Sequence, residues 1–264
     1  MIIDLSGKRA IVTGSTAGIG FAIASGLAAS GASVVLNGRS EKSVAAAQKR
    51  LTEKLPKAKV EGVAADLAHA DGVAAFIKRV GDADILVNNL GIFDPKPFLE
   101  IPDGDWQRFF ETNVMSGVRM ARHYAPAMVK RDWGRIVFIS SESGINIPVE
   151  MVHYGMTKSA QLAISLGLAA SLAGTGVTVN AVLPGPTRSE GVSDFFAEMA
   201  KEQGVSQDEM ERDFIAQHRP TSLLRRLATV DEVANMVVYA CSTQASATNG
   251  AALRVDGGVV RSIL

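Results

Sequence analysis

Tyr154 and Lys158 form a Tyr-x-x-x-Lys step, and Ser141 lies thirteen residues before the tyrosine. One helical turn separates Tyr154 from Lys158, so both side chains would lie on the same face of a helix. A free tyrosine titrates at about pH 10, but a nearby lysine ammonium favours the phenolate and brings its pKa toward the working range. A serine at the end of a strand could donate a hydrogen bond to a substrate carbonyl. The spacing predicts proton transfer to a substrate oxygen, although this step also occurs by chance in helices and serine is an ordinary turn residue.

A glycine-rich turn upstream runs from Thr13 to Gly20. It follows a predicted strand and opens a predicted helix, so its glycines would let the backbone approach a pyrophosphate held by free N–H groups at the helix N-terminus. The glycine spacing is G-x-x-x-G-x-G rather than G-x-G-x-x-G, and an ordinary tight turn remains the alternative. The residues expected to bind a dinucleotide here are Gly14, Ser15, Thr16, Gly18, Ile19 and Gly20.

Arg39 follows the second predicted strand, which ends at Leu36. A carboxylate near this strand end would hydrogen-bond the adenosine ribose of NAD, whereas an arginine can pair with the extra phosphate of NADP. The acid is missing here, so the sequence favours NADP, with a solvated arginine as the alternative. Asp66 closes the third strand and could reach the adenine edge or cap the following helix.

Short apolar runs alternate with longer helical patterns between these residues. Several of the runs lack two-residue alternation, as expected of parallel strands covered on both faces. The pattern predicts a doubly wound parallel α/β sheet in a single domain spanning residues 1–264. The expected strands are 9–13, 33–36, 60–64, 85–87, 135–140 and 177–182, and the expected helices are 19–29, 43–55, 73–80, 105–130 and 152–172.

Residues 187–227 interrupt this alternation. Ser206 and Glu209 form a capping box that predicts a helix running to about His218, with Met210 and Phe214 on one face. An earlier apolar stripe consists of Phe195, Phe196 and Met199, and Gly204 separates the two helical segments. We expect a substrate lid hinged near Gly185 and Gly191; packing on the domain or on a neighbouring subunit is the alternative.

Composition narrows the class of protein. Lys+Arg and Asp+Glu both total 27, so no basic field would attract nucleic acid or an anionic membrane. The single cysteine, Cys241, and the lack of a signal-peptide pattern predict a reduced, cytoplasmic protein. The four histidines have no metal-ligand spacing, so we expect no metal, and His153 is expected at a pocket rim or on the surface.

Taken together, these motifs resemble the short-chain dehydrogenase/reductase family over essentially the whole chain. The matching elements are the glycine-rich turn, Asp66, residues 88–91 (Asn-Asn-Leu-Gly), Asn113, Ser141, Tyr154-x-x-x-Lys158, Asn180, Pro184-Gly185 and residues 255–258 (Val-Asp-Gly-Gly). Leu90 departs from the alanine usual in the family, which adds bulk beside the cofactor without removing a functional group.

The resemblance implies a seven-stranded Rossmann-like sheet and a catalytic tetrad of Asn113, Ser141, Tyr154 and Lys158. Tyr154 would exchange a proton with the substrate oxygen, Ser141 would position the carbonyl, and Lys158 would bond the nicotinamide ribose. Asn113 would hold a water in a proton relay. Further cofactor contacts are implied at Asp66, Leu67, Asn89, Gly91, Pro184, Gly185 and Thr187.

The expected function is an NADP(H)-preferring carbonyl reductase or alcohol dehydrogenase acting on a small-to-medium, partly apolar substrate, similar to 3-oxoacyl carrier-protein reductases. The resemblance also implies a homotetramer, with a dimer next. An enoyl reductase is disfavoured because the tyrosine and lysine of that related group stand further apart. An NAD-dependent alcohol or sugar dehydrogenase and a non-catalytic dinucleotide-sensing or scaffold protein remain the alternatives.

Overall fold

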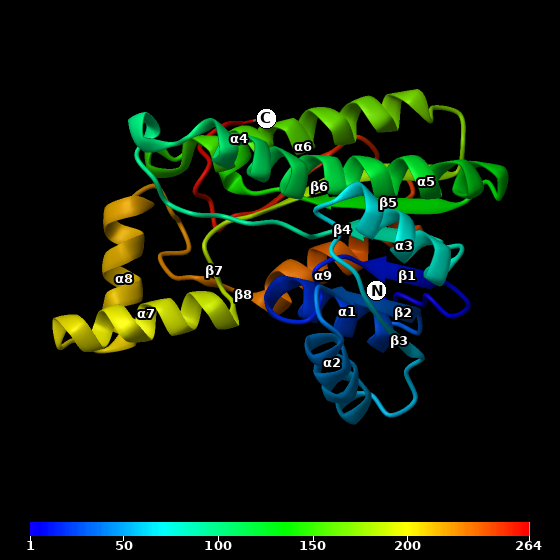
Figure 1. Cartoon of the computed structure of the whole chain (residues 1–264), viewed down its shortest axis with the longest axis horizontal. Coiled ribbons are helices and arrows are strands. Elements are labelled where there is room, and N and C mark those ends of the chain that lie inside the picture. The colour runs from blue at the N-terminus through cyan, green and yellow to red at the C-terminus, as the bar shows by residue number, and fades with distance from the viewer. Residues whose placement is uncertain (264) are drawn as a thin grey trace.

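The computed structural model describes residues 1–263, except for the side chain of Phe195, and its centre is a sheet of seven parallel strands (Figure 1). The strand order β3-β2-β1-β4-β5-β6-β9 confirms the doubly wound Rossmann-like sheet. The strands are β1 (Arg9–Val12), β2 (Ser33–Gly38), β3 (Val60–Ala64), β4 (Ile85–Asn88), β5 (Gly134–Ile139), β6 (Val177–Pro184) and β9 (Ala252–Val255).

Helices cover both faces of the sheet, which is why β4, β5 and β6 are buried along their whole length. The helices are α1 (Gly18–Ala29), α2 (Glu41–Lys54), α3 (Ala70–Val80), α4 (Asp103–Phe110), α5 (Ser116–Lys130), α6 (Val152–Ser171), α7 (Glu190–Gln203), α8 (Gln207–His218) and α9 (Val230–Ala240). No helix within residues 1–263 is both long and apolar enough to cross a membrane.

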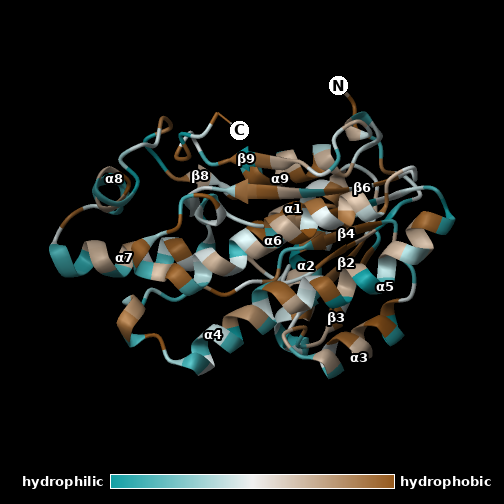
Figure 2. Ribbon diagram, turned by 90° about the horizontal axis from the view of Figure 1, so that it is seen from above, coloured by the Kyte–Doolittle hydropathy of each residue, from teal (hydrophilic) through white to brown (hydrophobic). Residues whose placement is uncertain are grey.

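Neighbouring residues of each strand point into two different hydrophobic clusters. Ala10 and Val12 of β1 join the cluster beneath α1, α2 and α9, whereas Ile11 joins the cluster beneath α3, α5 and α6. This is the two-residue period of a strand whose two faces are both apolar. Figure 2 shows hydrophobic residues gathered along the central strands of the sheet.

Two sequence predictions differ from the structure. The helix expected over residues 105–130 is split into α4 and α5 by a π-helical turn, Glu111–Met115, a feature that apolar spacing does not reveal. The strand β9 was not predicted from hydrophobic pattern, because as an edge strand it is half-exposed and short. It was expected only through the family resemblance.

The segment 187–227 forms a separate pair of helices beside the sheet (Figure 1). Its two ends are joined where β7 (Thr187–Arg188) pairs with β8 (Ala228–Thr229). The capping box of Ser206 and Glu209 begins α8 as predicted, and Gly204 ends α7 in the left-handed region at φ 69°. Phe196, Met210 and neighbouring apolar residues form a small cluster of their own, whereas the predicted contribution of the Phe195 side chain lies outside the described residues.

Candidate active site

The four predicted catalytic residues come together above the carboxyl end of β5. Ser141 follows β5 directly, Asn113 lies in the π-helical turn, and Tyr154 and Lys158 lie on α6. Ser141 hydrogen-bonds the Tyr154 hydroxyl, and the Lys158 Nζ atom lies 5.5 Å from the centroid of the Tyr154 ring. The arrangement places a hydroxyl pair beside an amine, as proton transfer to a substrate oxygen requires.

Burial controls the protonation of this group. It raises the pKa of Tyr154 to about 12, and the hydrogen bond from Ser141 opposes that rise. It also lowers the pKa of Lys158 to about 7. The sequence-based expectation of a lowered Tyr154 pKa therefore differs from the direction in this structure, because loss of hydration outweighs the opposing effects of the Ser141 hydrogen bond and the Arg219 charge.

Asn113 is fixed by the protein around it. Its side-chain Oδ1 accepts a hydrogen bond from the Ile92 amide at 2.8 Å, and its Nδ2 donates to the Ile92 carbonyl and to Thr157 Oγ1, each at 3.0 Å. Its backbone carbonyl accepts a bond of 2.6 Å from Gln161 Nε2. Sequence reasoning missed Gln161; the available signal was a polar residue three positions after Lys158 on the same helix face.

The glycine-rich turn has the geometry of a phosphate cradle. Gly14 and Gly18 have positive φ angles of 60° and 55°, which favour glycine. A Cβ atom on Gly20 would lie 2.4 Å from the Gly14 carbonyl oxygen and 2.5 Å from Asn89 Nδ2, so this position must stay bare. The Asn89 amide also donates to the carbonyl oxygens of Thr13 and Gly14 at 3.0 and 2.9 Å. The turn thus stays narrow and uncovered at the N-terminus of α1, which is the kind of position where anions bind in proteins.

Not every residue of the turn faces outward. The Ser15 hydroxyl donates to the Val12 carbonyl at 2.7 Å and accepts from the Asn37 amide at 3.0 Å, and the Ser15 side chain is fully buried. Ser15 therefore supports the turn from inside, and its hydroxyl is not presented to a ligand.

A cavity of about 160 Å³ opens at the carboxyl ends of β1, β2 and β3. Its lining includes five of the predicted cofactor-binding residues, Gly14, Thr16, Arg39, Asp66 and Leu67. Arg39 is exposed at its edge. The Asp66 carboxylate also accepts from the Ala68 amide at 3.1 Å, so Asp66 both lines the cavity and stabilises the turn before α3. The cavity lies at the carboxyl ends of the strands, where open parallel sheets bind their ligands.

Asn37 lies near the carboxyl end of β2, and its side chain bonds to the backbone of neighbouring strands and turns. Its Oδ1 accepts from the Gly14 amide at 3.2 Å, and its Nδ2 donates to the carbonyls of Val63 and Ala65. The charged side chain at this strand end is therefore Arg39.

The remaining predicted cofactor contacts lie between the tetrad and the ends of β4 and β6. A Cβ atom on Gly91 would lie 3.3 Å from Lys158 Nζ and 3.6 Å from Asn113 Oδ1, so Gly91 leaves this side of the tetrad uncovered. Pro184 ends β6, and a Cβ atom on Gly185 would lie 2.7 Å from the Asp256 carbonyl oxygen. Thr187 Oγ1 donates to the Gly185 carbonyl at 2.8 Å. The last predicted contact, Ile19, lies elsewhere, in the first turn of α1 next to Gly20.

A buried ion pair joins the catalytic loop to the helical insertion. Glu142, next to Ser141, accepts from Arg219 Nε at 2.7 Å, and both side chains are less than a tenth exposed. Burial raises the pKa of Glu142, with the Arg219 charge opposing. Sequence reasoning missed this pair because its members are 77 residues apart.

His153 does not lie at a pocket rim or on the surface, as the sequence had suggested. It is fully buried, with its ring centroid 4.0 Å from that of Phe109. Neighbouring positions on a helix face about 100° apart, so the residue beside Tyr154 points toward α4. Burial lowers its pKa, which favours the neutral imidazole.

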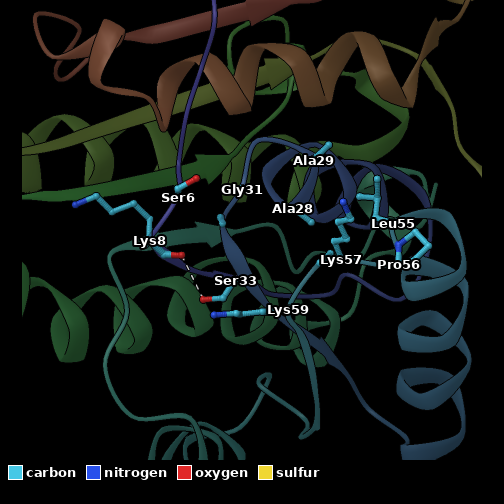
Figure 3. A pocket seen from close by; sticks show the side chains of 13 residues that line it. Ser6, Lys8, Ala28, Ala29, Gly31, Ser33, Leu55, Pro56, Lys57 and Lys59 are labelled. Carbon is cyan, nitrogen blue, oxygen red and sulfur yellow. Dashed lines mark hydrogen bonds between the residues drawn. The ribbon is translucent and has the colours of Figure 1, made fainter.

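A further cavity, of about 740 Å³, lies at the opposite edge of the sheet, and Figure 3 shows the side chains that line it. It is lined by residues that precede β1, β2 and β3, including Lys8, Lys57 and Lys59. Ligands of open parallel sheets bind at the carboxyl ends of the strands, so this cavity does not belong to the catalytic site. Within residues 1–263 no group of three or more His, Cys, Asp and Glu side chains is arranged to hold a metal ion.

Comparison with known proteins identifies similar chains over the full length. A family model described as enoyl-(acyl carrier protein) reductase matches residues 14–260. The oxidoreductase YvaG of Bacillus subtilis (strain 168) is 46% identical, with 100% of both chains covered. The 3-oxoacyl-[acyl-carrier-protein] reductase of Aquifex aeolicus is 34% identical, covering 98% of this chain and 100% of the relative. The crystal structure of L-sorbose reductase from Gluconobacter frateurii, complexed with NADPH and L-sorbose, matches with a TM-score of 0.92 and 33% identity over 100% of both chains.

Proposed function

The chain belongs to the short-chain dehydrogenase/reductase family and is an NAD(P)-dependent oxidoreductase, and on that premise we propose that it prefers NADP(H) and interconverts a carbonyl group and a secondary alcohol. The observation that carries the proposal is the hydrogen-bonded pair of Ser141 and Tyr154 beside Lys158. The proposed catalytic residues are Asn113, Ser141, Tyr154 and Lys158.

Each residue has a defined task in this reaction. The nicotinamide, when bound, supplies or accepts the hydride. Ser141 donates a hydrogen bond to the carbonyl oxygen, and Tyr154 delivers the proton to that oxygen during reduction. Because burial raises its pKa to about 12, Tyr154 is protonated at neutral pH and ready to act as the acid. Lys158 would bind the nicotinamide ribose, and Asn113 would hold a water of the proton relay.

The cofactor preference rests on the adenosine end of the site. Arg39 lines the cavity at the end of β2, and Asn37, the polar residue nearby, is committed to backbone groups. An arginine there can make charge-assisted hydrogen bonds with a ribose phosphate. The solved relative that contains NADPH supports the same preference.

NADPH and NADH titrations test this preference. Arg39→Asp should weaken NADPH binding by roughly ten- to a hundredfold, the equivalent of about 1.5 to 3 kcal/mol, and leave NADH binding nearly unchanged. Arg261→Asp, the same charge change at an exposed residue outside the cavity lining, is the control. Equal or tighter binding of NADH by the wild-type protein would refute the preference.

A substrate panel tests the reaction. NADPH oxidation should accompany reduction of ketoses or of 3-oxoacyl thioesters, the substrates that the names of two relatives indicate. The description of the matching family model makes enoyl thioesters the second candidate. We favour the carbonyl reaction because the spacing of Tyr154 and Lys158 resembles that of carbonyl reductases. Turnover of enoyl thioesters alone would reverse this assignment, and tight NADPH binding without any turnover would favour a dinucleotide sensor.

We also propose a single domain over residues 1–264, with residues 187–227 as a substrate lid. Hydrophobic clusters on both faces of one sheet support the single domain.

We propose a homotetramer, supported by exposed apolar side chains such as Phe110 on α4 and Leu166 on α6. The one cysteine is buried and free, in keeping with a cytoplasmic location.

A further inference from the structure

Gln161 lies three residues after Lys158 on α6 and is 1% exposed. Both ends of its side-chain amide are bonded to members of the proposed tetrad. Nε2 donates to the Asn113 carbonyl at 2.6 Å, and Oε1 accepts from Lys158 Nζ at 3.3 Å. One buried side chain therefore joins two of the four residues directly.

Burying a side-chain amide costs free energy of folding unless the amide is hydrogen-bonded. The hydrogen-bond partners of Gln161 therefore indicate its role. Gln161 reaches from α6 to the π-helical turn Glu111–Met115, where hydrogen bonding shifts from the i−4 to the i−5 pattern. The amide fixes the spacing between α6, which carries Lys158, and the turn that carries Asn113.

The same contact limits the directions available to Lys158. An ammonium group has three N–H donors. One points to the Ile139 carbonyl at 3.0 Å and one to Gln161 Oε1. Gly91 lies on another side of the Lys158 Nζ atom. A Cβ atom at position 91 would lie 3.3 Å from Nζ, so the glycine leaves this side of the amine uncovered. The two acceptors thus occupy two of the three donor directions, which leaves one N–H for a ligand.

We propose that Gln161 is a positioning residue of this enzyme: its amide holds Lys158 Nζ and the Asn113 carbonyl in one arrangement, so that the tetrad is aligned before the ligands arrive. The inference rests on the proposed function, since it assigns Gln161 a role through Lys158 and Asn113. The alternative is that Gln161 only fills space between α6 and the π-helical turn.

Two substitutions separate these readings. Gln161→Met keeps an unbranched side chain of similar length and loses both hydrogen bonds. Gln161→Glu keeps an oxygen that can accept a hydrogen bond from Lys158. Because a carboxylate has no N–H, this variant loses the hydrogen bond to the Asn113 carbonyl. Its negative charge also favours the ammonium form of Lys158. Ser165→Ala is the matched control, because Ser165 is buried one turn further along α6 and has no hydrogen bond to the tetrad among the described residues.

The measurements are kcat, the KM for NADPH and the pH dependence of both, together with the melting temperature from pH 6 to 9. Gln161→Met should lower kcat about 10- to 100-fold, as expected when a reacting group is misplaced. Gln161→Glu should move the pH transition assigned to Lys158 upward by about one unit. The other titratable and charged groups nearby are Tyr154 itself and the two groups that act on it, Glu142 and Arg219, and neither variant replaces any of them. Ser165→Ala should change neither kcat nor the pH transition assigned to Lys158.

The proposal is overturned if Gln161→Met keeps the wild-type kcat and pH profile, or if Gln161→Glu leaves the Lys158 transition in place. A wild-type protein that turns over no substrate refutes the proposed function instead, and the melting curves still report the Lys158 transition. Should Gln161→Met fail to fold, Gln161→Glu alone decides the matter through that transition.

Discussion

The helix α6, which carries Lys158, lies against the sheet, whereas α7 and α8 lie beside the sheet and pack mainly on each other (Figure 1). Asn113, Lys158 and Gln161 are each no more than 4% exposed, and their helices cover the cluster that contains Phe138 and Met120. Exposing them to solvent requires the core itself to open.

The helical insertion has its own small apolar cluster around Phe196 and Ile215. Arg188 pairs with Glu211 inside the insertion. Contacts with the rest of the chain include Arg50 Nη1 to Glu190 at 3.0 Å and the Arg219–Glu142 pair. A unit held in this way can open locally while the sheet stays folded. We infer from this difference between the sheet region and the insertion that separate parts of the chain align the reacting groups and control access of the substrate.

The largest effect is expected at Tyr154, in the rigid part. Tyr154→Phe keeps the ring, which packs 6.4 Å from Phe93 between centroids, and removes the hydroxyl bonded to Ser141. Turnover should fall by about 10² to 10⁴ with cofactor affinity nearly unchanged, because only the proton donor is lost. Steady-state kinetics and NADPH titration measure the two quantities. Retained turnover would remove Tyr154 from the mechanism, and Tyr239→Phe, on α9, is the control.

Lys158 should make global stability depend on pH. Its pKa is 10.5 in the unfolded chain and about 7 in the folded one, so the unfolded chain binds more protons between these values. The free energy of unfolding should therefore rise from pH 7 to pH 9, by at most about 1.4 kcal/mol per pH unit from this group, and fall as the pH drops toward 7. Denaturant unfolding at several pH values measures the slope.

Lys158→Met should remove that slope and impair both catalysis and cofactor binding. Lys54→Met, at an exposed position at the end of α2, should leave the slope unchanged. An identical slope in the Lys158→Met protein would mean that Lys158 is not held in a rigid, dehydrated position, and the contrast with the insertion would fail.

The sequence predicted the features that depend on local chemistry. The apolar strands, the turn around Gly14, the capping box at Ser206 and the spacing of Tyr154 and Lys158 all follow from residues close together in the chain. The fold class was confirmed for that reason. Arg39 and Asp66, each singled out from the sequence at a strand end, line one cavity in the structure, because parallel strands end at one edge of the sheet.

The missed features depend on residues that meet only in the folded protein. Gln161 looks like any polar helix residue until the π-helical turn is brought against it. Glu142 and Arg219 carry no signal of pairing at their separation. The direction of the Tyr154 pKa was also missed, since the degree of burial decides whether desolvation or a neighbouring charge dominates.

The smallest expected effect, and the most direct test of the contrast, is local opening of the insertion. Without ligands, backbone amides of residues 195–214 should exchange hydrogen faster than those of β5, and NADPH with substrate should slow them. Arg219→Met removes the contact with Glu142 and should speed exchange in α8 about tenfold, as expected for loss of a charge-assisted hydrogen bond. Arg212→Met, at an exposed position on the same helix, is the matched control. Hydrogen exchange read by mass spectrometry resolves these segments. If residues 195–214 are already as protected as residues 135–140 without ligands, the insertion is a fixed packing or subunit-interface element, and access to the site must be controlled elsewhere.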